Sequence, residues 1–259
     1  MIRSLYTATT GMRVQQHKID AIGNNIANVS TTGYKSTRPD FKETLYDVME
    51  VRPAHAQANL LVGNGVRAGT VQRIFTQGAL RQTNNRLDLA LEGPGFFAVG
   101  YEDGQNVYTR DGTFKLSYMP NGQVRLDNME GYPVLDQYGQ PIIFYGDISE
   151  DNLTINQDGS IYLTNEYGSF YQGTLGIYTF ADPSSLQSVR ASYFMATEGS
   201  GQPVQALNTR VIQGYLEQSN VDMAKEMTEL IIAQRAYQLN SRVVQTADEM
   251  EKQANSLRG

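Results

Sequence analysis

The chain has 259 residues, of which 40% are hydrophobic and 19% are charged, and its formal net charge at pH 7 is −6. This length can bury the core of one large domain or two modest ones, and the negative charge argues against nucleic acid as the main partner, because phosphate binding needs a clustered basic surface. The absence of cysteine excludes disulfides and thiolate chemistry, no run reaches the ~20 apolar residues of a membrane span, and residues 1–20 lack the apolar core of a signal peptide, which alone predicts a cytosolic protein.

A narrow stripe runs through the first thirty residues at alternating spacings of three and four. Its positions are Leu5, Ala8, Met12, Gln15, Ile19, Ile22, Ile26 and Val29. This spacing is typical of the a/d seam of a coiled coil. Such a helix needs a partner, because most helix stability in proteins comes from packing the apolar face. We therefore predict an N-terminal helix that ends near Asn28 and is followed by a turn at Gly33.

The next segment has weaker signals. A short second helix after Pro39 is predicted from the spacing of four apolar residues, Phe41, Leu45, Val48 and Met49. Residues 50–65 show no consistent period and contain one proline and two glycines. They are predicted to form a flexible linker or an interaction loop.

From Val66 onward, short runs of alternating or β-branched residues are separated by turn residues at intervals of about eight to twelve. The turn dipeptides are Asp103-Gly104, Asp111-Gly112, Asn121-Gly122 and Asp158-Gly159. Asn-Gly and Asp-Gly supply the positive φ angles of tight hairpins, so this pattern predicts a β meander. Most of the 16 tyrosines lie here, as expected for half-buried strands.

A second, longer amphipathic helix is predicted at the C-terminal end. Ser219 or Asn220 is the predicted N-cap, with Asp222 in the first turn complementing the helix dipole. Residues at helical spacing then continue without an interrupting Gly or Pro, namely Met223, Met227, Leu230, Ala233, Tyr237, Val244, Ala247, Met250, Ala254 and Leu257. This helix is a suitable partner for the first one. The seams do not decide whether the two helices pair within one chain or between copies.

These elements predict an α+β fold in which the two terminal helices form a coiled-coil-like module and an all-β domain is inserted between them. The predicted regions are a terminal helical assembly module of residues 1–34 plus 219–259, a connecting segment of residues 35–69 plus 206–218, and a β-rich outer domain of residues 70–205.

The sequence offers no catalytic constellation. His17 and His55 are isolated and lack metal-ligand spacing. The glycines at 63–69 and Gly93-Pro94-Gly95 do not match a nucleotide-binding loop. Asp158 and Glu166 are a conceivable glycosidase pair, but an Asp before Gly is typical of a turn. We therefore expect no enzymatic activity, cofactor, metal or small-molecule substrate.

Three stretches of the chain together resemble the bacterial flagellar rod and hook axial proteins. The first, within residues 24–35, carries Asn24, Asn25, Asn28, Gly33 and Tyr34. The second, within residues 77–114, carries Gly93, Gly95, Phe96, Phe97, Arg110, Asp111 and Gly112. The third, within residues 214–237, carries Ser219, Asn220 and Val221. Their order and spacing match along essentially the whole chain.

Within this family, residues 1–5 and 233–237 are most similar to the distal-rod type, and the proximal-rod paralogue is the alternative. Two features depart from the family pattern. Gly93-Pro94-Gly95 stands where many members have Gly-Gln-Gly, and the linker at 46–64 is shorter than in distal-rod proteins of bacteria with an outer membrane.

The resemblance implies a structural subunit of the flagellar basal body rather than an enzyme. It implies helical stacking into a tube that transmits torque, with both terminal helices inside and the β domain outside. It also implies export through the flagellar type III apparatus, unfolded and without a cleaved signal. The implied partners are other copies of the chain, neighbouring rod and hook proteins, the export apparatus and, where an outer membrane exists, the bushing rings.

We expect an assembly seam formed by Leu5, Met12, Ile19, Ile22, Ile26, Val29, Met223, Met227, Leu230, Tyr237, Val244, Met250 and Leu257. Because ordering a residue costs about 1–2 kcal/mol, residues 1–30 and 221–259 are predicted to be disordered in isolated subunits and to order when neighbours supply apolar surface. Two other classes are compatible with the pattern, a secreted β-rich carbohydrate-active enzyme and a cytosolic binding module capped by a coiled coil.

Overall fold

The computed structural model describes residues 2–45, 47–48, 61–101, 104–146, 148–165, 168–190 and 192–256. The chain forms two compact units, each built from segments that are distant in sequence. Unit 1 consists of Met1–Ala27, Thr37–Arg73 and Asp222–Gly259, and unit 2 consists of Asn28–Ser36 and Ile74–Val221. The threefold division predicted from the sequence concerns roles in assembly and stays a prediction.

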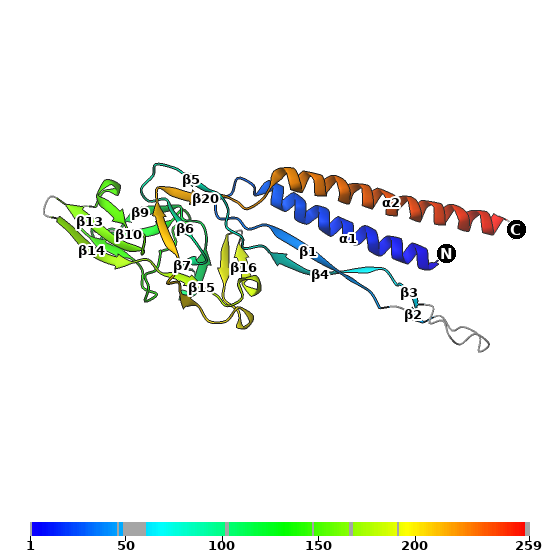
Figure 1. Ribbon diagram of the computed structural model, residues 1–259, viewed down its shortest axis with the longest axis horizontal. Helices are drawn as coiled ribbons and strands as arrows, with labels where there is room; N and C mark the ends of the chain where they lie inside the picture. Colours follow the sequence, from blue (N-terminus) through cyan, green and yellow to red (C-terminus); the bar gives the residue numbers. More distant parts are fainter. Residues whose placement is uncertain are drawn as a thin grey trace. The chain divides into compact units, whose positions relative to one another are not determined.

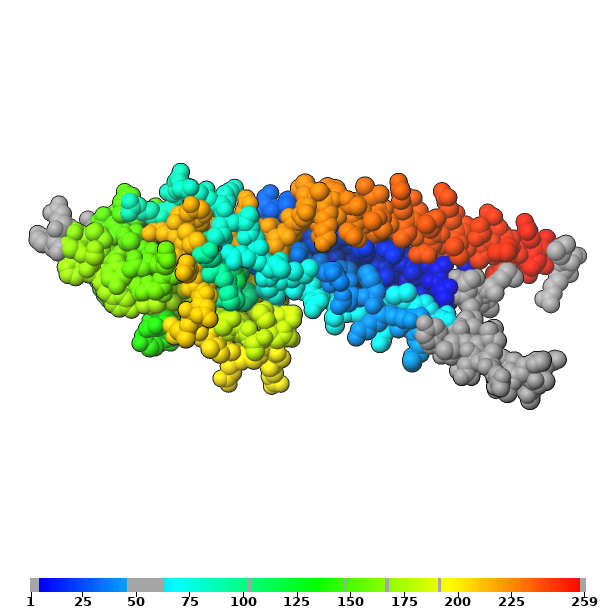
Figure 2. All heavy atoms as spheres, viewed as in Figure 1, coloured from blue at the N-terminus to red at the C-terminus, as the bar shows by residue number. Residues whose placement is uncertain are grey.

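Two long helices from the two ends of the chain form the main part of unit 1. Helix α1 spans Ile2–Ala27 and helix α2 spans Met223–Ser256. They lie side by side within one chain (Figures 1 and 2), which settles the pairing that the seams left open. The predicted fold class, terminal helices in contact with an inserted β-rich region, is confirmed.

Small side chains bring the two helices together. The buried apolar side chains of the described part of unit 1 are those of Ala8, Val14 and Ile22 on α1 and of Ala233 and Ala247 on α2. A Cβ atom added at Gly11 would lie 2.9 Å from Nδ2 of Asn240, so the Asn240 side chain of α2 packs closely on the α1 backbone at that glycine. Five buried apolar side chains are few for two helices of 26 and 34 residues, so most apolar side chains described on this pair are at least partly exposed.

An antiparallel β ribbon completes unit 1. Strand β1 (Thr37–Glu43) pairs with β4 (Val66–Arg73), and β2 (Asp47–Val48) pairs with β3 (Leu61–Val62). The helix predicted after Pro39 is therefore wrong for this stretch. Too few apolar residues defined its period, and pairing with β4 overrides such a weak local preference. Pro39 borders a shift of register, where a missing backbone N–H is tolerated. Of the predicted linker, residues 50–60 and the preceding Met49 lie outside the described residues.

Helix α2 begins differently from the sequence expectation. The Asp222 carboxylate accepts hydrogen bonds from the backbone N–H groups of Ala224 (3.0 Å) and Lys225 (3.2 Å), so Asp222 acts as the capping side chain. Ser219 and Asn220, the predicted caps, make contacts within unit 2 instead. All of these residue types are good caps, so composition alone did not distinguish them.

Unit 2 is built from short antiparallel strands, which confirms the predicted β-rich region (Figure 1). A six-stranded sheet has the order β16 (Gln187–Arg190), β17 (Tyr193–Met195), β8 (Asn106–Thr109), β7 (Phe96–Gly100), β15 (Ile177–Thr179) and β18 (Val204–Gln205). Two three-stranded sheets comprise β11 (Ile143–Tyr145), β10 (Gln123–Asn128) and β9 (Phe114–Tyr118), and β12 (Leu153–Ile155), β13 (Ser160–Asn165) and β14 (Gly168–Thr174). Two-stranded pairs join β19 (Arg210–Gln213) to β6 (Leu89–Glu92) and β20 (Tyr215–Glu217) to β5 (Leu80–Gln82). Among the described residues, unit 2 also contains the short 3-10 helices η3 (Glu150–Asn152), η4 (Pro183–Ser185) and η5 (Glu198–Ser200).

Two of the predicted turns join paired strands. Gly122 (φ +75°) lies between β9 and β10, and Gly159 (φ +83°) lies between β12 and β13. The Asp111-Gly112 dipeptide does not form the predicted hairpin, because β8 and β9 belong to different sheets. There a Cβ at Gly112 would lie 1.7 Å from the Leu89 carbonyl oxygen, so glycine is required for a close backbone approach. Asp103 lies outside the described residues.

The hydrophobic core of the protein lies in unit 2. Three clusters of buried apolar side chains occur among the described residues, and all three belong to this unit. The largest includes Phe97, whose ring packs edge-to-face on Phe114 at 5.2 Å between centroids. The second includes Phe96, Tyr108 and Phe194.

Candidate functional site

The described residues contain no group of three or more His, Cys, Asp or Glu side chains that could hold a metal ion. Neither helix, over its described length, is apolar enough to cross a membrane. Asp158 accepts hydrogen bonds from the backbone N–H and the hydroxyl of Ser160, and these bonds lower its pKa. That is the behaviour of a turn residue, whereas a general acid needs a raised pKa. Glu166 lies outside the described residues.

One charged residue from each of the three family-like stretches lies at the same buried point of unit 2. The Lys35 Nζ atom lies 2.6 Å from Oε1 of Glu217, and the Arg110 Nη1 atom lies 3.0 Å from Oε2 of the same carboxylate. The side chains of Lys35 and Glu217 have no exposed surface, and that of Arg110 is 5% exposed. We call these three residues the charge junction.

Further hydrogen bonds reach the charge junction, although Nε of Arg110 is buried without a hydrogen-bond partner among the described residues. Glu217 Oε1 also accepts from the backbone N–H of Gly78 at 2.8 Å. Lys35 also donates to the Thr76 carbonyl at 2.8 Å, and Arg110 Nη2 donates to the Gly93 carbonyl at 2.8 Å. Burial lowers the pKa of Lys35 and of Arg110, and the Glu217 carboxylate opposes the shift in both. The junction is therefore held by charge-assisted bonds that compensate for the loss of water.

The neighbouring motif residues surround this junction. Asn220 Oδ1 accepts from the Ser36 N–H at 2.8 Å, and Asn220 Nδ2 donates to the Ile74 carbonyl at 2.8 Å. The Gly33 N–H donates to the Glu217 backbone carbonyl at 2.9 Å. Gly33 has φ +66°, and a Cβ there would lie 2.6 Å from the backbone of Arg110, so only glycine fits.

The other motif residues of unit 2 have structural contacts. Asp111 accepts from Thr32 Oγ1 at 3.0 Å and from the Thr113 N–H at 3.1 Å. Ser219 Oγ accepts from the Val221 N–H at 3.3 Å. The ring of Phe96 lies 5.4 Å from the Arg110 guanidinium. Tyr34, Phe96 and Phe97 are buried, and Gly93 and Gly95 both have positive φ.

The asparagines near the end of α1 divide between the two units. Asn25, 2% exposed, exchanges two hydrogen bonds of 2.9 Å with the backbone of Thr37 and so fixes the start of β1 against α1. Asn24 is exposed on α1. In unit 2, the Asn28 side chain accepts from Thr31 Oγ1 at 3.2 Å.

The predicted seam residues differ in exposure within the single chain. Ile22 is buried, and a larger set is half-buried, namely Leu5, Met12, Ile19, Ile26, Val29, Leu230 and Val244. Four are exposed, namely Met223 (46%), Met227 (42%), Tyr237 (37%) and Met250 (52%). Leu257 lies outside the described residues. Whether these residues form a seam between subunits stays a prediction.

Sequence reasoning missed two kinds of residue. It quoted Lys35 and Glu217 inside motifs but did not select them as site residues. Their presence in motifs distant in the chain was the available signal. It also missed exposed apolar residues of α2, namely Ile231, Ile232, Leu239 and Val243.

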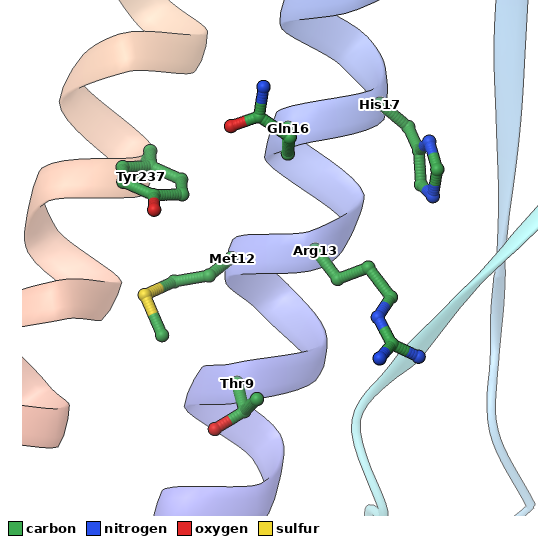
Figure 3. A pocket seen from close by; sticks show the side chains of 6 residues that line it. All are labelled: Thr9, Met12, Arg13, Gln16, His17 and Tyr237. Atoms are coloured by element: carbon green, nitrogen blue, oxygen red, sulfur yellow. The ribbon is translucent and has the colours of Figure 1, made fainter.

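A hollow of about 420 Å³ lies along the helix pair of unit 1. Five of its six lining residues come from α1 and one from α2, and they are Thr9, Met12, Arg13, Gln16, His17 and Tyr237. Figure 3 shows the Met12 side chain directed toward Tyr237, with Arg13 and His17 on the side of α1 away from α2. This lining contains no carboxylate, and the Thr9 hydroxyl donates to the Leu5 carbonyl at 2.7 Å.

Comparison with known proteins matches three family models to the chain. Residues 5–35 match the flagella basal body rod protein model. Residues 90–163 match the D1 domain of the flagellar hook protein FlgE/F/G family, and residues 212–257 match the flagellar basal body rod FlgEFG protein C-terminal model.

Similar relatives span the whole chain. The flagellar basal-body rod protein FlgG of Borreliella burgdorferi is 36% identical over 100% of this chain and 99% of the relative. FlgG of Agrobacterium fabrum is 38% identical over 96% and 97%, and FlgG of Bacillus subtilis is 34% identical over 100% of both. The flagellar hook-basal body complex protein FlhP of Bacillus subtilis is 33% identical over 100% of both. The chain therefore belongs to the family of flagellar basal-body rod proteins, a family of structural rather than enzymatic proteins.

Proposed function

We propose that this basal-body rod protein is a subunit of the distal rod and that its copies stack helically into a tube that transmits torque and encloses part of the export channel. The observation that carries this proposal is the exposed apolar surface of α2. Ile232, Leu239, Val243 and Met250 are between 45% and 61% exposed. A contiguous exposed apolar surface on a soluble chain is typical of an interaction site.

These four residues form one stripe. Their successive separations along α2 place them within about 40° of one another around the helix. Around α2, Leu239 lies about 120° from the buried Ala233, whereas Val243 and Met250 lie one turn from the buried Ala247, so the stripe borders the buried side of the helix. An apolar stripe that the chain itself leaves exposed needs a further partner helix, and another copy of the chain supplies one in a helical tube.

The hollow beside Tyr237 supports the same proposal. It lies along the helix pair, and its lining is exposed or half-buried in the single chain. A side chain from a neighbouring copy would fill it without disturbing unit 2. We assign the remaining partners on the family resemblance. They are neighbouring rod and hook proteins, the flagellar type III export apparatus and, where an outer membrane exists, the bushing rings.

The direct test introduces a charge into the stripe. Leu239→Glu should abolish incorporation into rods, because assembly would bury an unpaired carboxylate. Gln238→Glu adds the same charge at the adjacent exposed position and should assemble. Incorporation is measured by isolating basal bodies from cells that express each variant. If Leu239→Glu subunits entered rods at the wild-type level, the stripe would not be the assembly surface.

A second variant tests the predicted α1 seam. Ile22→Asp buries a charge on α1 and should prevent assembly while leaving unit 2 folded. Gln238→Glu, which adds a charge at an exposed position of the helix pair, is the control for this variant too. Rod incorporation and near-ultraviolet circular dichroism of the tyrosines of unit 2 report the two effects separately.

The alternative position is the proximal rod. The FlgG and FlhP relatives from Bacillus subtilis have nearly the same identity to this chain, 34% and 33%. Antibody labelling along isolated basal bodies distinguishes the two positions. Label at the hook-facing end of the rod supports the distal assignment, and label at the membrane-facing end contradicts it.

A further inference from the structure

Two cations and one anion are buried together in unit 2, and they come from three distant parts of the chain. Lys35 precedes Glu217 by 182 residues, and Arg110 precedes it by 107. In the described part of the chain, Glu217 is the acidic residue that forms an ion pair with either cation. The anion therefore lies far C-terminal to both cations in the sequence.

We propose that Glu217 is an electrostatic latch that holds residues 28–36 docked in unit 2. Without the Glu217 carboxylate, docking of this segment would bury Lys35 and Arg110 together with no counter-charge. A buried charge without a partner is far more costly than an exposed one. The segment should then remain undocked until residues 215–220 are in place.

The latch connects the two ends of the chain. Residues 28–36 directly follow α1, and residues 215–220 directly precede Val221 and α2. A chain that lacks its last part, or that has not yet folded there, leaves its N-terminal motif undocked. For assembly, a consequence that rests on the proposed function, this makes docking of the segment after α1 conditional on a complete chain.

The latch differs in a measurable way from ordinary packing, because the three side chains should not be equivalent. Lys35→Met removes one cation and leaves Glu217 with its bonds from Arg110 and Gly78. The Thr76 carbonyl still accepts from Asn220 Nδ2 at 3.2 Å. Glu217→Gln leaves two cations without an anion and places an amide nitrogen opposite one of the donors.

The experiment is hydrogen exchange on the full-length chain in dilute solution. It compares residues 28–36, where the Gly33 and Ser36 amides are bonded, with residues 160–165 of β13 as an internal reference. Glu217→Gln should speed exchange in residues 28–36 by about 100-fold or more. Lys35→Met should change it by less than about threefold. The double variant, Lys35→Met with Glu217→Gln, should exchange in residues 28–36 at least about tenfold more slowly than Glu217→Gln alone, because removing Lys35 removes the repulsion between the two cations.

Three results would overturn the latch. The first is residues 28–36 that stay as protected in Glu217→Gln as in the wild type. The second is an equal exchange rate of residues 28–36 in Lys35→Met and Glu217→Gln. The third is exchange in residues 28–36 that is as fast in the double variant, Lys35→Met with Glu217→Gln, as in Glu217→Gln alone. This third comparison still tests the latch if Glu217→Gln also speeds exchange in the reference strand. None of these measurements needs assembly, so they are independent of the outcome for Leu239→Glu.

Discussion

Unit 2 contains three clusters of buried apolar side chains, whereas the described part of unit 1 buries three such side chains on α1 and two on α2. The units also differ in how their exposed apolar side chains are arranged. Those of unit 2, such as Tyr118, Tyr145 and Leu207, are scattered over separate strands and loops, whereas Ile232 and Leu239 belong to one stripe along α2. Single exposed apolar residues are normal on a protein surface, but a contiguous stripe is typical of an interaction site. Unit 2 therefore has a core of its own, and the exposed stripe of unit 1 supports the proposal that other chains complete that unit.

The first prediction is the widest contrast in hydrogen exchange. Helices α1 and α2 contain 26 and 34 residues, and ordering each residue costs about 1–2 kcal/mol. The few buried side chains of unit 1 offset little of this cost. In dilute subunits we expect the amides of both helices to exchange through local openings whose free energy is near zero. The amides of β13 should exchange only through global unfolding, whose free energy is higher by about 5 kcal/mol or more. Protected helix amides in a dilute subunit would contradict the contrast.

A matched pair of substitutions sharpens the comparison. Leu126→Ala removes a side chain that is 0% exposed in the core of unit 2 and should destabilise the isolated subunit by about 2–5 kcal/mol. Leu230→Ala makes the same chemical change at a half-buried position of α2. It should leave the urea midpoint of unit 2 unchanged. Equal shifts of the midpoint would show that the two units unfold as one.

Alkaline pH should act on unit 2 through a buried tyrosine. Tyr108 is 4% exposed and packs edge-to-face on Phe180 at 4.8 Å. Burial, with a smaller contribution from Tyr178, raises the pKa of Tyr108 from 10.0 to about 12. As pH rises, Tyr108 loses its proton in the unfolded chain at a lower pH than in the folded chain. Its contribution to the free energy of unfolding is therefore fully present below about pH 10 and is lost between about pH 10 and 12.

The expected loss from this tyrosine is about 2 kcal/mol. Urea unfolding at pH 9 and pH 11.5 measures it, with tyrosinate absorbance as the titration signal. Tyr108→Phe removes the ionising group and should make the decline in stability shallower. An unchanged pH dependence in Tyr108→Phe would assign the alkaline loss to other tyrosines.

The sequence predicted what depends on local pattern. The long helices followed from the spacing of residues such as Leu5 and Ile22, and the hairpin turns at Gly122 and Gly159 followed from Asn-Gly and Asp-Gly. Pairing over long distances was less accessible. Strand β1 pairs with β4, which is distant in the sequence, and the local spacing of apolar residues carries no information on such a partner. The residues of β1 were therefore assigned to a helix.

The candidate site was only partly predictable for the same reason. The motifs that carry Gly33, Arg110 and Asn220 were found, but their convergence is a property of the fold. Nothing in the sequence around Lys35 or Glu217 distinguishes a buried ion pair from two solvated charges. Likewise, helical spacing alone could not separate the face of α2 that packs on α1, at Ala233, from the face that stays exposed, at Leu239.

The smallest expected effect comes from an ion pair on the surface of unit 1. The Lys18 Nζ atom lies 2.6 Å from Oε2 of Glu229, the same distance that joins Lys35 to Glu217. The Lys18 and Glu229 side chains, however, are 28% and 40% exposed. Water and salt screen such a pair, so Lys18→Met should cost assembled subunits less than about 1 kcal/mol, and less still at high salt.

A titration measures the remaining contribution of this pair. The hydrogen bond and charge of Lys18 lower the pKa of Glu229, so its contribution is present above the ordinary pKa of 4.5 and is lost as pH falls through the lowered value. Lys18→Met should return the pKa of Glu229 toward 4.5, as followed by nuclear magnetic resonance. Glu217→Gln removes the anion from a pair at the same distance but with both side chains fully buried. If the free-energy cost of Lys18→Met in rods equalled the cost of Glu217→Gln for docking residues 28–36, distance rather than burial would determine the strength of these pairs.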